Sequence, residues 1–510
     1  MTTVEQVFQR VRGRPQRGDT PFLVVVVLVT IGCRLLLANR PATPDEGGFL
    51  VVASQWHVGG SSLYGNYWVD RPPLLIGIFR IADLAGGLIA LRVIGALLAA
   101  ATVVVLADTA RRAFGIRAAR WTALVAAALL VSPLSGSQAV NGELLALPFL
   151  ALGFRLAVEA VRATDPLSAR GAALGTGVAA VLALLVKQNM ADVAVFALVC
   201  WLVAWRTGRL TGRSCRDLFA LAAVGGGLGY AVVMLWAMAH GTSPLGVYEA
   251  TYPFRVHAGR VLMATAGERT DIRLDRLGTA AVLSGIVPIL LGFVLLAVRR
   301  TRSAPEVWGI VAAAVFAGVS IVSGGSYWLH YLVQALPVAA LATGALAAVR
   351  RPATRIFVPV LVVGVVVSAA ASVATVATHH QANPGAVVAR SLESAAQPGD
   401  TMLSAFGDGD IVQETGMPSP YPYLWSLPTR TLDPDLTLMR GVLAGPSAPT
   451  WVVVRGRHTM GILDAHGVGA LIDDRYRLVG DVCSRYVYVR QDVSRPALAP
   501  PDSCSGLVLP

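Results

Sequence analysis

Long apolar runs separated by short arginine-rich connections dominate this sequence of 510 residues. A helix needs about 20 apolar residues to cross the hydrocarbon core of a bilayer. Charged residues make up only 14% of the chain, whereas a soluble domain carries about 25%. The runs therefore predict an α-helical polytopic membrane protein with about 11 transmembrane helices. The expected spans are residues 21–38, 88–110, 118–137, 142–161, 170–187, 190–206, 217–240, 277–298, 306–323, 328–349 and 356–377.

The arginines predict how these spans are oriented. Clusters precede the first run and occupy every second connection: Arg10, Arg12, Arg14 and Arg17; Arg111, Arg112, Arg117 and Arg120; Arg162 and Arg170; Arg206, Arg209, Arg213 and Arg216; Arg299, Arg300 and Arg302; Arg350, Arg351 and Arg355. Basic loops stay in the cytoplasm. We therefore expect a multi-pass protein of the plasma membrane with a cytoplasmic N-terminus and an extracytoplasmic C-terminus. The net charge of +12 lies in these clusters, so no nucleic-acid partner is predicted.

The composition changes after the last apolar run. Pro, Asp and Gly become more frequent, and the apolar stretches shorten to strand length. Strands are expected at residues 402–406, 451–454 and 486–489, with a helix near 387–395. This pattern predicts a small extracytoplasmic α/β domain, residues 378–510, after a transmembrane domain of residues 1–377. Cys483 and Cys504 both lie in the outer domain, where an oxidising exterior would let them pair.

Two outer loops, residues 39–87 and 241–276, are long enough to hold chemistry. The first contains Asp45 and Glu46, directly after the turn signal Pro44 and before an expected amphipathic helix at residues 47–58. Acidic residues suit the start of a helix, so one interpretation of the pair is purely structural. The same loop then continues with Tyr64 and Tyr67 and ends in Asp70-Arg71-Pro72-Pro73-Leu74.

An acidic pair after the first span, a tyrosine-containing stretch and an Asp-Arg-Pro-Pro motif resemble the GT-C glycosyltransferases. The resemblance is closest to the branch with the protein O-mannosyltransferases and the lipid A aminoarabinose transferase. It covers the membrane region in outline, and its sharp motifs span only Asp45 to Leu74. A weaker similarity lies in Tyr327-Trp328-Leu329-His330-Tyr331. The resemblance implies a GT-C fold, a sugar donor on a polyprenyl phosphate, Asp45 as catalytic base, and Glu46 as its helper or an acceptor contact.

The chemistry of such a transfer is consistent with these residues. A lipid phosphate leaves readily, so one carboxylate that takes the proton of the acceptor hydroxyl is sufficient. Cationic groups would then stabilise the charge that grows on the phosphate. The candidate substrate-binding residues are Tyr64, Arg71, Glu143, Lys187, Arg255, His330 and Tyr331.

Each candidate also has a structural interpretation. Arg71 would pair with Asp70, and Lys187 would extend its amine to the membrane surface. Arg255 would anchor an interfacial helix, and His330 would be a structural histidine. Glu143, near the outer end of the fourth span, would start a helix, although an acid so close to the bilayer is usually functional.

The predicted function is a glycosyltransferase of the hexosyl- or pentosyltransferase type. It would move a sugar from a polyprenyl-phosphate donor, with inversion, to an extracytoplasmic glycolipid, cell-wall glycan or protein. A transporter or flippase for a lipid-linked sugar is one alternative, and a non-catalytic cell-wall scaffold is another. No metal-ligand cluster of recognisable spacing occurs, yet a divalent cation at Asp45 and Glu46 stays open because some members of the family use one.

Overall fold

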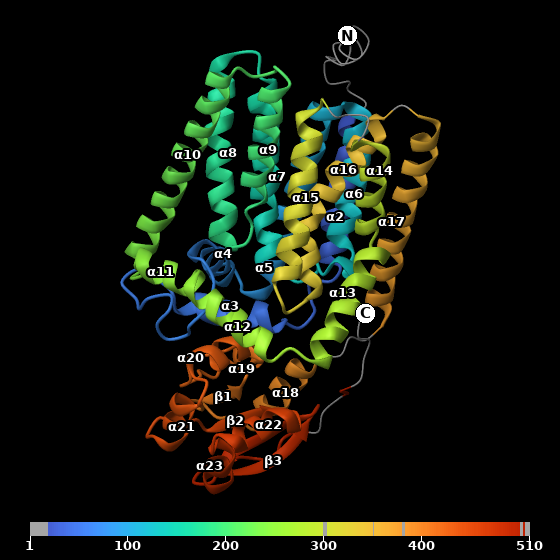
Figure 1. Ribbon diagram of the computed structural model, residues 1–510. Helices are drawn as coiled ribbons and strands as arrows, with labels where there is room; N and C mark the ends of the chain where they lie inside the picture. The colour runs from blue at the N-terminus through green and yellow to red at the C-terminus, as the bar shows by residue number, and fades with distance from the viewer. Residues whose placement is uncertain (1–18, 299–302, 350, 380–382, 500–502, 505–510) are drawn as a thin grey trace.

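The structure is a computed structural model, and it describes residues 19–298, 303–349, 351–379, 383–499 and 503–504. The arginines at positions 10, 12, 14, 17, 299, 300, 302 and 350 lie outside this range. A helical bundle forms most of the molecule, and a small α/β domain lies against one end of it (Figure 1).

The long helices of the bundle follow the apolar runs. They are α2 (Asp19–Leu35), α5 (Leu88–Phe114), α6 (Ile116–Val131), α7 (Gly142–Arg162), α8 (Pro166–Val186), α9 (Asp192–Arg206), α10 (Gly212–Ala239), α13 (Glu268–Leu283), α14 (Ile286–Leu296), α15 (Pro305–Ser323), α16 (Leu336–Ala348) and α17 (Pro352–Thr378). Short helices connect them at the end that faces the outer domain. These are α3 (Pro44–Gln55), α4 (Pro73–Leu84), η1 (Pro133–Ser135), α11 (Pro244–Thr251), α12 (Pro253–Ala264) and η3 (Leu329–Ala335).

Seven helices in the described part of the chain are long and apolar enough to cross a membrane. The bent pair α13 and α14, which meet at 60°, would make eight. The other three expected spans coincide with the shorter helices α2, α6 and α9, of 17, 16 and 15 residues. For α6 the cause is local, because Pro133 cannot continue the helix and starts the 3-10 turn η1. The count of eleven therefore stays a prediction.

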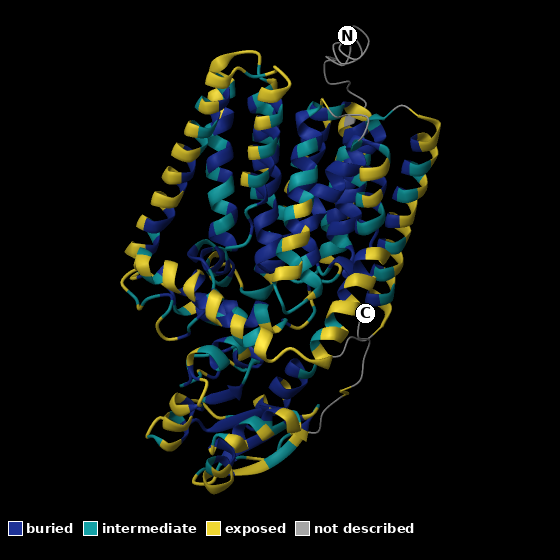
Figure 2. Cartoon of the chain, viewed as in Figure 1, coloured by how far each residue is buried: buried dark blue, intermediate teal, exposed yellow. Residues whose placement is uncertain are grey.

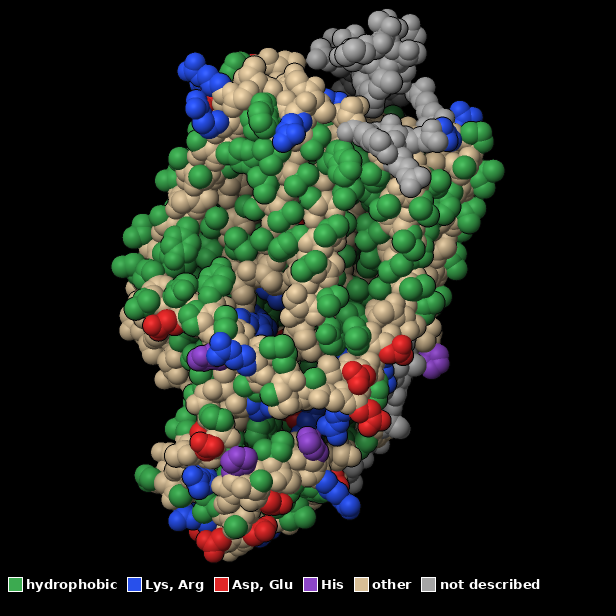
Figure 3. All heavy atoms as spheres, in the orientation of Figure 1, with side chains coloured by type: hydrophobic (Ala, Val, Ile, Leu, Met, Phe, Trp, Pro, Cys, Tyr) green, Lys and Arg blue, Asp and Glu red, His purple; other side chains and the backbone are tan. Residues whose placement is uncertain are grey.

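Side-chain chemistry divides the molecule into zones. Exposed positions cover the outer faces of the bundle, for example along α10 and α17 (Figure 2). Most of these positions are hydrophobic. At the end far from the outer domain the charged side chains in view are mostly Lys and Arg, whereas the outer domain shows Lys, Arg, Asp and Glu together (Figure 3). At that far end, ion pairs tie helices together, as where Arg162 of α7 meets the buried Glu306 of α15 at 2.6 Å. An apolar belt with a basic end is typical of a membrane protein.

The outer domain contains one four-stranded sheet in the order β1-β2-β4-β3. Strands β1 and β2 are parallel, and β4 pairs antiparallel with both β2 and β3. The elements are α18 (Pro384–Glu393), β1 (Met402–Ala405), α19 (Gly409–Thr415), α20 (Ser426–Leu432), α21 (Thr437–Ala444), β2 (Trp451–Arg455), α22 (Gly456–Ala465), α23 (Val468–Arg475), β3 (Tyr476–Val482) and β4 (Arg485–Arg490). The three expected strands and the expected helix are present, and Cys483 and Cys504 form a disulfide. The edge strand β3 was not predicted, because only two of its seven residues are buried and three are exposed.

Glycines let the outer domain approach the first outer loop closely. A Cβ atom on Gly47 of α3 would lie 2.5 Å from Cα of Asp410, and one on Gly48 would lie 2.5 Å from Cζ2 of Trp425. Because neither glycine has a side chain, α3 packs directly against α19 and the segment before α20. Residues far apart in the sequence are thereby brought to the turn that carries Asp45.

Asp410 makes this contact sensitive to pH. Its side chain is buried, and burial, followed by the neighbouring carboxylate of Asp408, raises the pKa of Asp410 to about 7. The folded chain then holds a proton that the unfolded chain releases near pH 4, so stability falls as pH rises from about 4 to about 7. We expect Asp410→Asn to raise the apparent Tm of the full chain by a few degrees at pH 8 and hardly at all at pH 4.5. Thermal denaturation at the two pH values checks this, and an equal shift at both would contradict it.

Candidate active site

Asp45 lies in the first turn of α3. Thr43 caps this helix, since its hydroxyl accepts a hydrogen bond from the backbone N–H of Glu46 at 3.3 Å while the Glu46 carboxylate accepts one from the N–H of Thr43 at 3.0 Å. This capping box, with Pro44 at the first helical position, starts the helix three residues before the expected position 47. Both acids are thus helix-start residues, but their side chains have different surroundings.

The Asp45 side chain is half-buried and contacts the outer domain. Its Oδ1 atom accepts a hydrogen bond from the indole Nε1 of Trp425 at 3.0 Å. Trp425 is also held by Phe49, one turn further along α3, at 5.1 Å between ring centroids. This arrangement orients the carboxylate and leaves it lone pairs for a substrate hydroxyl.

Glu46 is completely buried and points into the protein. Its carboxylate forms an ion pair with Arg92 of α5, at 3.0 Å from Nη2, and accepts the backbone N–H of Val140 at 3.0 Å. Arg92 also donates to the carbonyl oxygens of Ala38 and Pro41. These bonds hold the loop between α2 and α3 in place. Since protein donors occupy both Glu46 oxygens, the pair of Asp45 and Glu46 does not fit the divalent cation left open above.

Asp70 joins two of the predicted cations. Its carboxylate lies 2.5 Å from Nη1 of Arg71 and 3.0 Å from Nε of Arg255, on α12. Burial alone would raise the pKa of Asp70, but Arg255 and then Arg71 outweigh it, so this pKa lies below its usual value. The hydroxyl of Tyr64 donates to the carbonyl oxygen of Arg71 at 3.1 Å. The Asp-Arg-Pro-Pro motif thus carries an anion between two guanidinium groups.

A second charged cluster joins three segments that are far apart in the sequence. Lys187, the C-cap of α8, forms a buried ion pair with Glu143 in the first turn of α7. His330 approaches the same carboxylate at 3.6 Å, and the Lys187 amine lies 5.1 Å from the ring centre of Tyr331. The clusters meet where Gln188 donates to the carbonyl oxygen of Asp70 at 3.2 Å.

These clusters border one cavity of about 450 Å³. Its wall contains the charged side chains of Lys187, Glu143 and Arg255, with Tyr331 beside Lys187. The wall also contains the apolar side chains of Leu262, Phe316, Val319 and Ile321. Val319 is 60% exposed on α15, so the cavity reaches the apolar outer face of the bundle. A site of this kind suits a molecule with an anionic head and a hydrocarbon tail.

The sequence did not single out some residues of this region. Asn189, Ser320 and Gln334 line the cavity and are joined by hydrogen bonds, in which the Asn189 amide donates to Ser320 at 2.9 Å and to Gln334 at 3.1 Å. Gln334 also donates to Asp192 at 2.9 Å. The sequence signal that could have identified these three residues is their polar character inside or beside apolar runs. Trp425, 380 residues from Asp45, was also not predicted as a site residue.

The structure therefore brings together eight of the nine predicted site residues, all except Glu46. Asp45 belongs to this group because its negative charge acts on Arg71. Burial alone would lower the pKa of Arg71, but Asp70, followed by Asp45 and Glu143, raises it above its usual value. Among the described residues, no three His, Cys, Asp or Glu side chains are gathered as a metal site.

Comparison with known proteins identifies the fold. No family model matches the chain, and no curated protein matches it in sequence. The structure is similar to ArnT from Cupriavidus metallidurans in the apo state, with a TM-score of 0.59 at 14% identity over 92% of this chain and 98% of that one. The form of ArnT bound to undecaprenyl phosphate matches with a TM-score of 0.58 at 15% identity over 93% and 98%. The Archaeoglobus fulgidus oligosaccharyltransferase, tethered with an acceptor peptide, matches with a TM-score of 0.57 at 12% identity over 94% and 74%.

Proposed function

We propose that this chain, which has the fold of the GT-C glycosyltransferases, is a membrane glycosyltransferase that uses a polyprenyl-phosphate sugar donor. One observation carries the proposal: Asp45 is a half-buried carboxylate whose charge acts on Arg71, and Arg71 shares the carboxylate of Asp70 with Arg255, which lines a cavity with both charged and apolar side chains. Two similar structures contain a bound polyprenyl phosphate: undecaprenyl phosphate in ArnT and dolichol phosphate in the oligosaccharyltransferase AglB of Archaeoglobus fulgidus.

The proposed reaction is a single displacement with inversion. The acceptor O–H loses its proton to the Asp45 carboxylate as its oxygen attacks the anomeric carbon. The bond between that carbon and the phosphate oxygen breaks, and the lipid phosphate leaves as a monophosphate. No general acid is required, in contrast to glycoside hydrolysis, because the departing phosphate spreads the negative charge it gains over its oxygens and so leaves without a proton.

The donor phosphate would lie against Lys187 and Arg255, with the hydrocarbon tail along the apolar side chains of the cavity. Glu143 and Asp70 hold these two cations in place before the donor arrives. Fixed positive charge near a leaving phosphate stabilises the transition state most where water is excluded. Glu46 is assigned a positioning role, because its oxygens are used by Arg92, Thr43 and Val140.

The acceptor would approach from the side of the outer domain, where Trp425 contacts the base. We assign this face to the exterior of the plasma membrane, since the basic end of the bundle points the other way (Figure 3). The acceptor is a hydroxyl of a glycolipid, a cell-wall glycan or a protein, and the sugar is a hexose or a pentose.

Arg255 and Arg260 provide a matched test of the donor site. Both lie on α12, but only Arg255 lines the cavity, and Arg260 is exposed. Losing a hydrogen bond between a half-buried guanidinium and a phosphate costs about 1.5 kcal/mol or more. We therefore expect Arg255→Gln to raise the KM for the polyprenyl-phosphate donor at least about tenfold and Arg260→Gln to leave it unchanged. Initial rates of sugar transfer at varied donor concentration measure this, and equal KM values for the two variants would contradict the assignment.

A further inference from the structure

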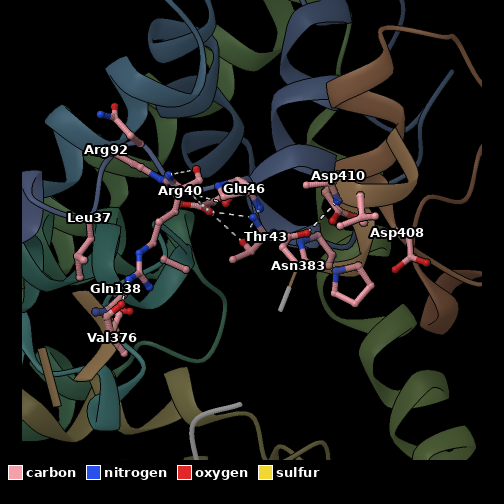
Figure 4. Close-up of a pocket in the computed structure, with 18 of the residues that line it drawn as sticks. Leu37, Arg40, Thr43, Glu46, Arg92, Gln138, Val376, Asn383, Asp408 and Asp410 are labelled. Carbon is pink, nitrogen blue, oxygen red and sulfur yellow. Dashed lines mark hydrogen bonds and ion pairs between the residues drawn. The ribbon is translucent and has the colours of Figure 1, made fainter. Parts of the chain in front are cut away.

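A second cavity, of about 610 Å³, lies between the bundle and the outer domain (Figure 4). Its wall comes from the outer ends of α2 and α17, the loop before α3, and α18 and α19 of the outer domain. It shares no lining residue with the Lys187 cavity. Thr43, Pro44 and Glu46 border it, so the helical turn that carries Asp45 forms part of its wall.

The charged residues in the described wall are mostly cationic. Its arginines are Arg34, Arg40, Arg92, Arg390, Arg455 and Arg485, and its carboxylates are Glu46, Asp408 and Asp410. Two of the carboxylates are matched within the wall: Glu46 by Arg92, and Asp408 by Arg485, whose Nε and Nη2 atoms lie 2.9 and 3.1 Å from its two oxygens. Arg455 is a weaker partner of Asp408, at 3.8 Å from Oδ1. The formal excess of positive charge favours an anion.

Three buried polar atoms in this wall have no hydrogen-bond partner in the described part of the chain: Nε of Arg34, Nε2 of Gln138 and Oδ1 of Asp410. Asp410 is only 3% exposed. Buried polar groups are nearly always paired, so unpaired ones at a cavity point to a ligand. The two nitrogens can donate to an anion, and the Asp410 oxygen can accept a hydroxyl. Arg34 is held in place for this role, because its Nη1 donates to the carbonyl oxygens of Leu130 and Ser137 at 2.8 and 2.7 Å.

Apolar side chains also form part of the wall. Leu37, Val131 and Val376 line it at the outer ends of three bundle helices. Figure 4 shows Leu37 and Val376 together on one side of the cavity, with Asp408 and Asp410 across from them. A free phosphate ion would gain nothing from these apolar residues, whereas a lipid would bury the start of its chains against them.

We infer that this cavity binds the phosphate or carboxylate headgroup of an anionic lipid, at a site separate from the donor cavity. The apolar part of the wall favours a lipid over a free anion of the same chemistry. The inference goes beyond the transfer reaction and does not depend on it, because binding is measured without a sugar donor. Since the wall includes the turn that carries Asp45, the bound headgroup lies next to the base.

Two arginines of one segment give a matched test. Both Arg455 and Arg457 are exposed, but only Arg455 lines the cavity. Native mass spectrometry of the purified full chain would count bound dioctanoyl phosphatidic acid as its concentration is raised. We expect Arg455→Gln to weaken one site about fivefold, as for a contact at the rim, and Arg457→Gln to leave it unchanged. Arg255→Gln, in the other cavity, should also leave this site unchanged.

A variant that should bind the lipid more tightly separates a true effect on the site from a loss of binding caused by misfolding. Asp410→Asn removes a negative charge from the wall and should tighten the same site about fivefold. Equal affinity of the two arginine variants would overturn the inference, as would equally tight binding of dioctanoyl phosphatidylcholine. If inorganic phosphate displaces the lipid at comparable concentration, the occupant is a soluble anion and the assignment to a lipid is wrong.

Discussion

Asp45→Asn is expected to lower the rate of sugar transfer by about 10²- to 10⁴-fold, the range associated with loss of a general base. Asparagine has nearly the same shape as aspartate and keeps an oxygen that can accept the hydrogen bond from Trp425. It cannot take a proton from an acceptor hydroxyl. The donor KM should change little, because Asp45 does not line the donor cavity. Steady-state rates with purified protein at saturating donor measure the effect.

Asp271→Asn is the matched control for this variant. Asp271 also lies in the first turn of a helix, α13, but it is exposed. The loss of a first-turn charge should cost both variants only about 0.5 kcal/mol of stability, so both should fold. If Asp45→Asn folds and transfers sugar at the wild-type rate, Asp45 is not the base.

Glu46→Gln is expected to lower the stability of the protein rather than its rate of sugar transfer. The change leaves the buried guanidinium of Arg92 without its carboxylate and weakens the capping box of α3. Breaking a buried ion pair from one side costs about 3–5 kcal/mol, which should appear as a large fall in Tm and in the yield of folded protein. The material that does fold should retain much of its transfer rate per molecule.

Glu268→Gln provides the comparison, because Glu268 is a first-turn glutamate of α13 that is exposed. It should leave Tm and yield unchanged. A Glu46→Gln protein with the wild-type Tm and a transfer rate reduced as far as that of Asp45→Asn would refute the positioning role and make Glu46 part of the reaction.

The membrane half of the fold could be predicted because it depends on local composition. Apolar runs and arginine clusters are visible in single stretches of sequence, and each expected span coincides with a helix or a helix pair. The number that cross the membrane could not be fixed in this way. Helices α6 and α9 are shorter than the expected spans, since Pro133 ends one and Asp192 begins the other.

The site residues that belong to one sequence motif could be predicted, whereas the surroundings of each side chain could not, because tertiary contacts determine them. Adjacent acids cannot be distinguished by sequence, yet Asp45 meets Trp425 while Glu46 is buried against Arg92. The partner Trp425 is 380 residues away, and the close approach at Gly47 and Gly48 that brings it there has no local signal. The pairing of Lys187 with Glu143 likewise joins two helix ends that only the folded bundle brings together.

The most direct test of the central claim follows both halves of the donor at once. Purified protein in liposomes would be given polyprenyl-phosphate sugars labelled in the sugar, together with a membrane extract as the source of acceptor. The account predicts that label enters a new product while free polyprenyl monophosphate is released in equal amount, and that Asp45→Asn abolishes both. If the donor crosses the bilayer with its bond to the sugar intact, or binds and stays unchanged, the chain is a flippase or a scaffold and the account is wrong.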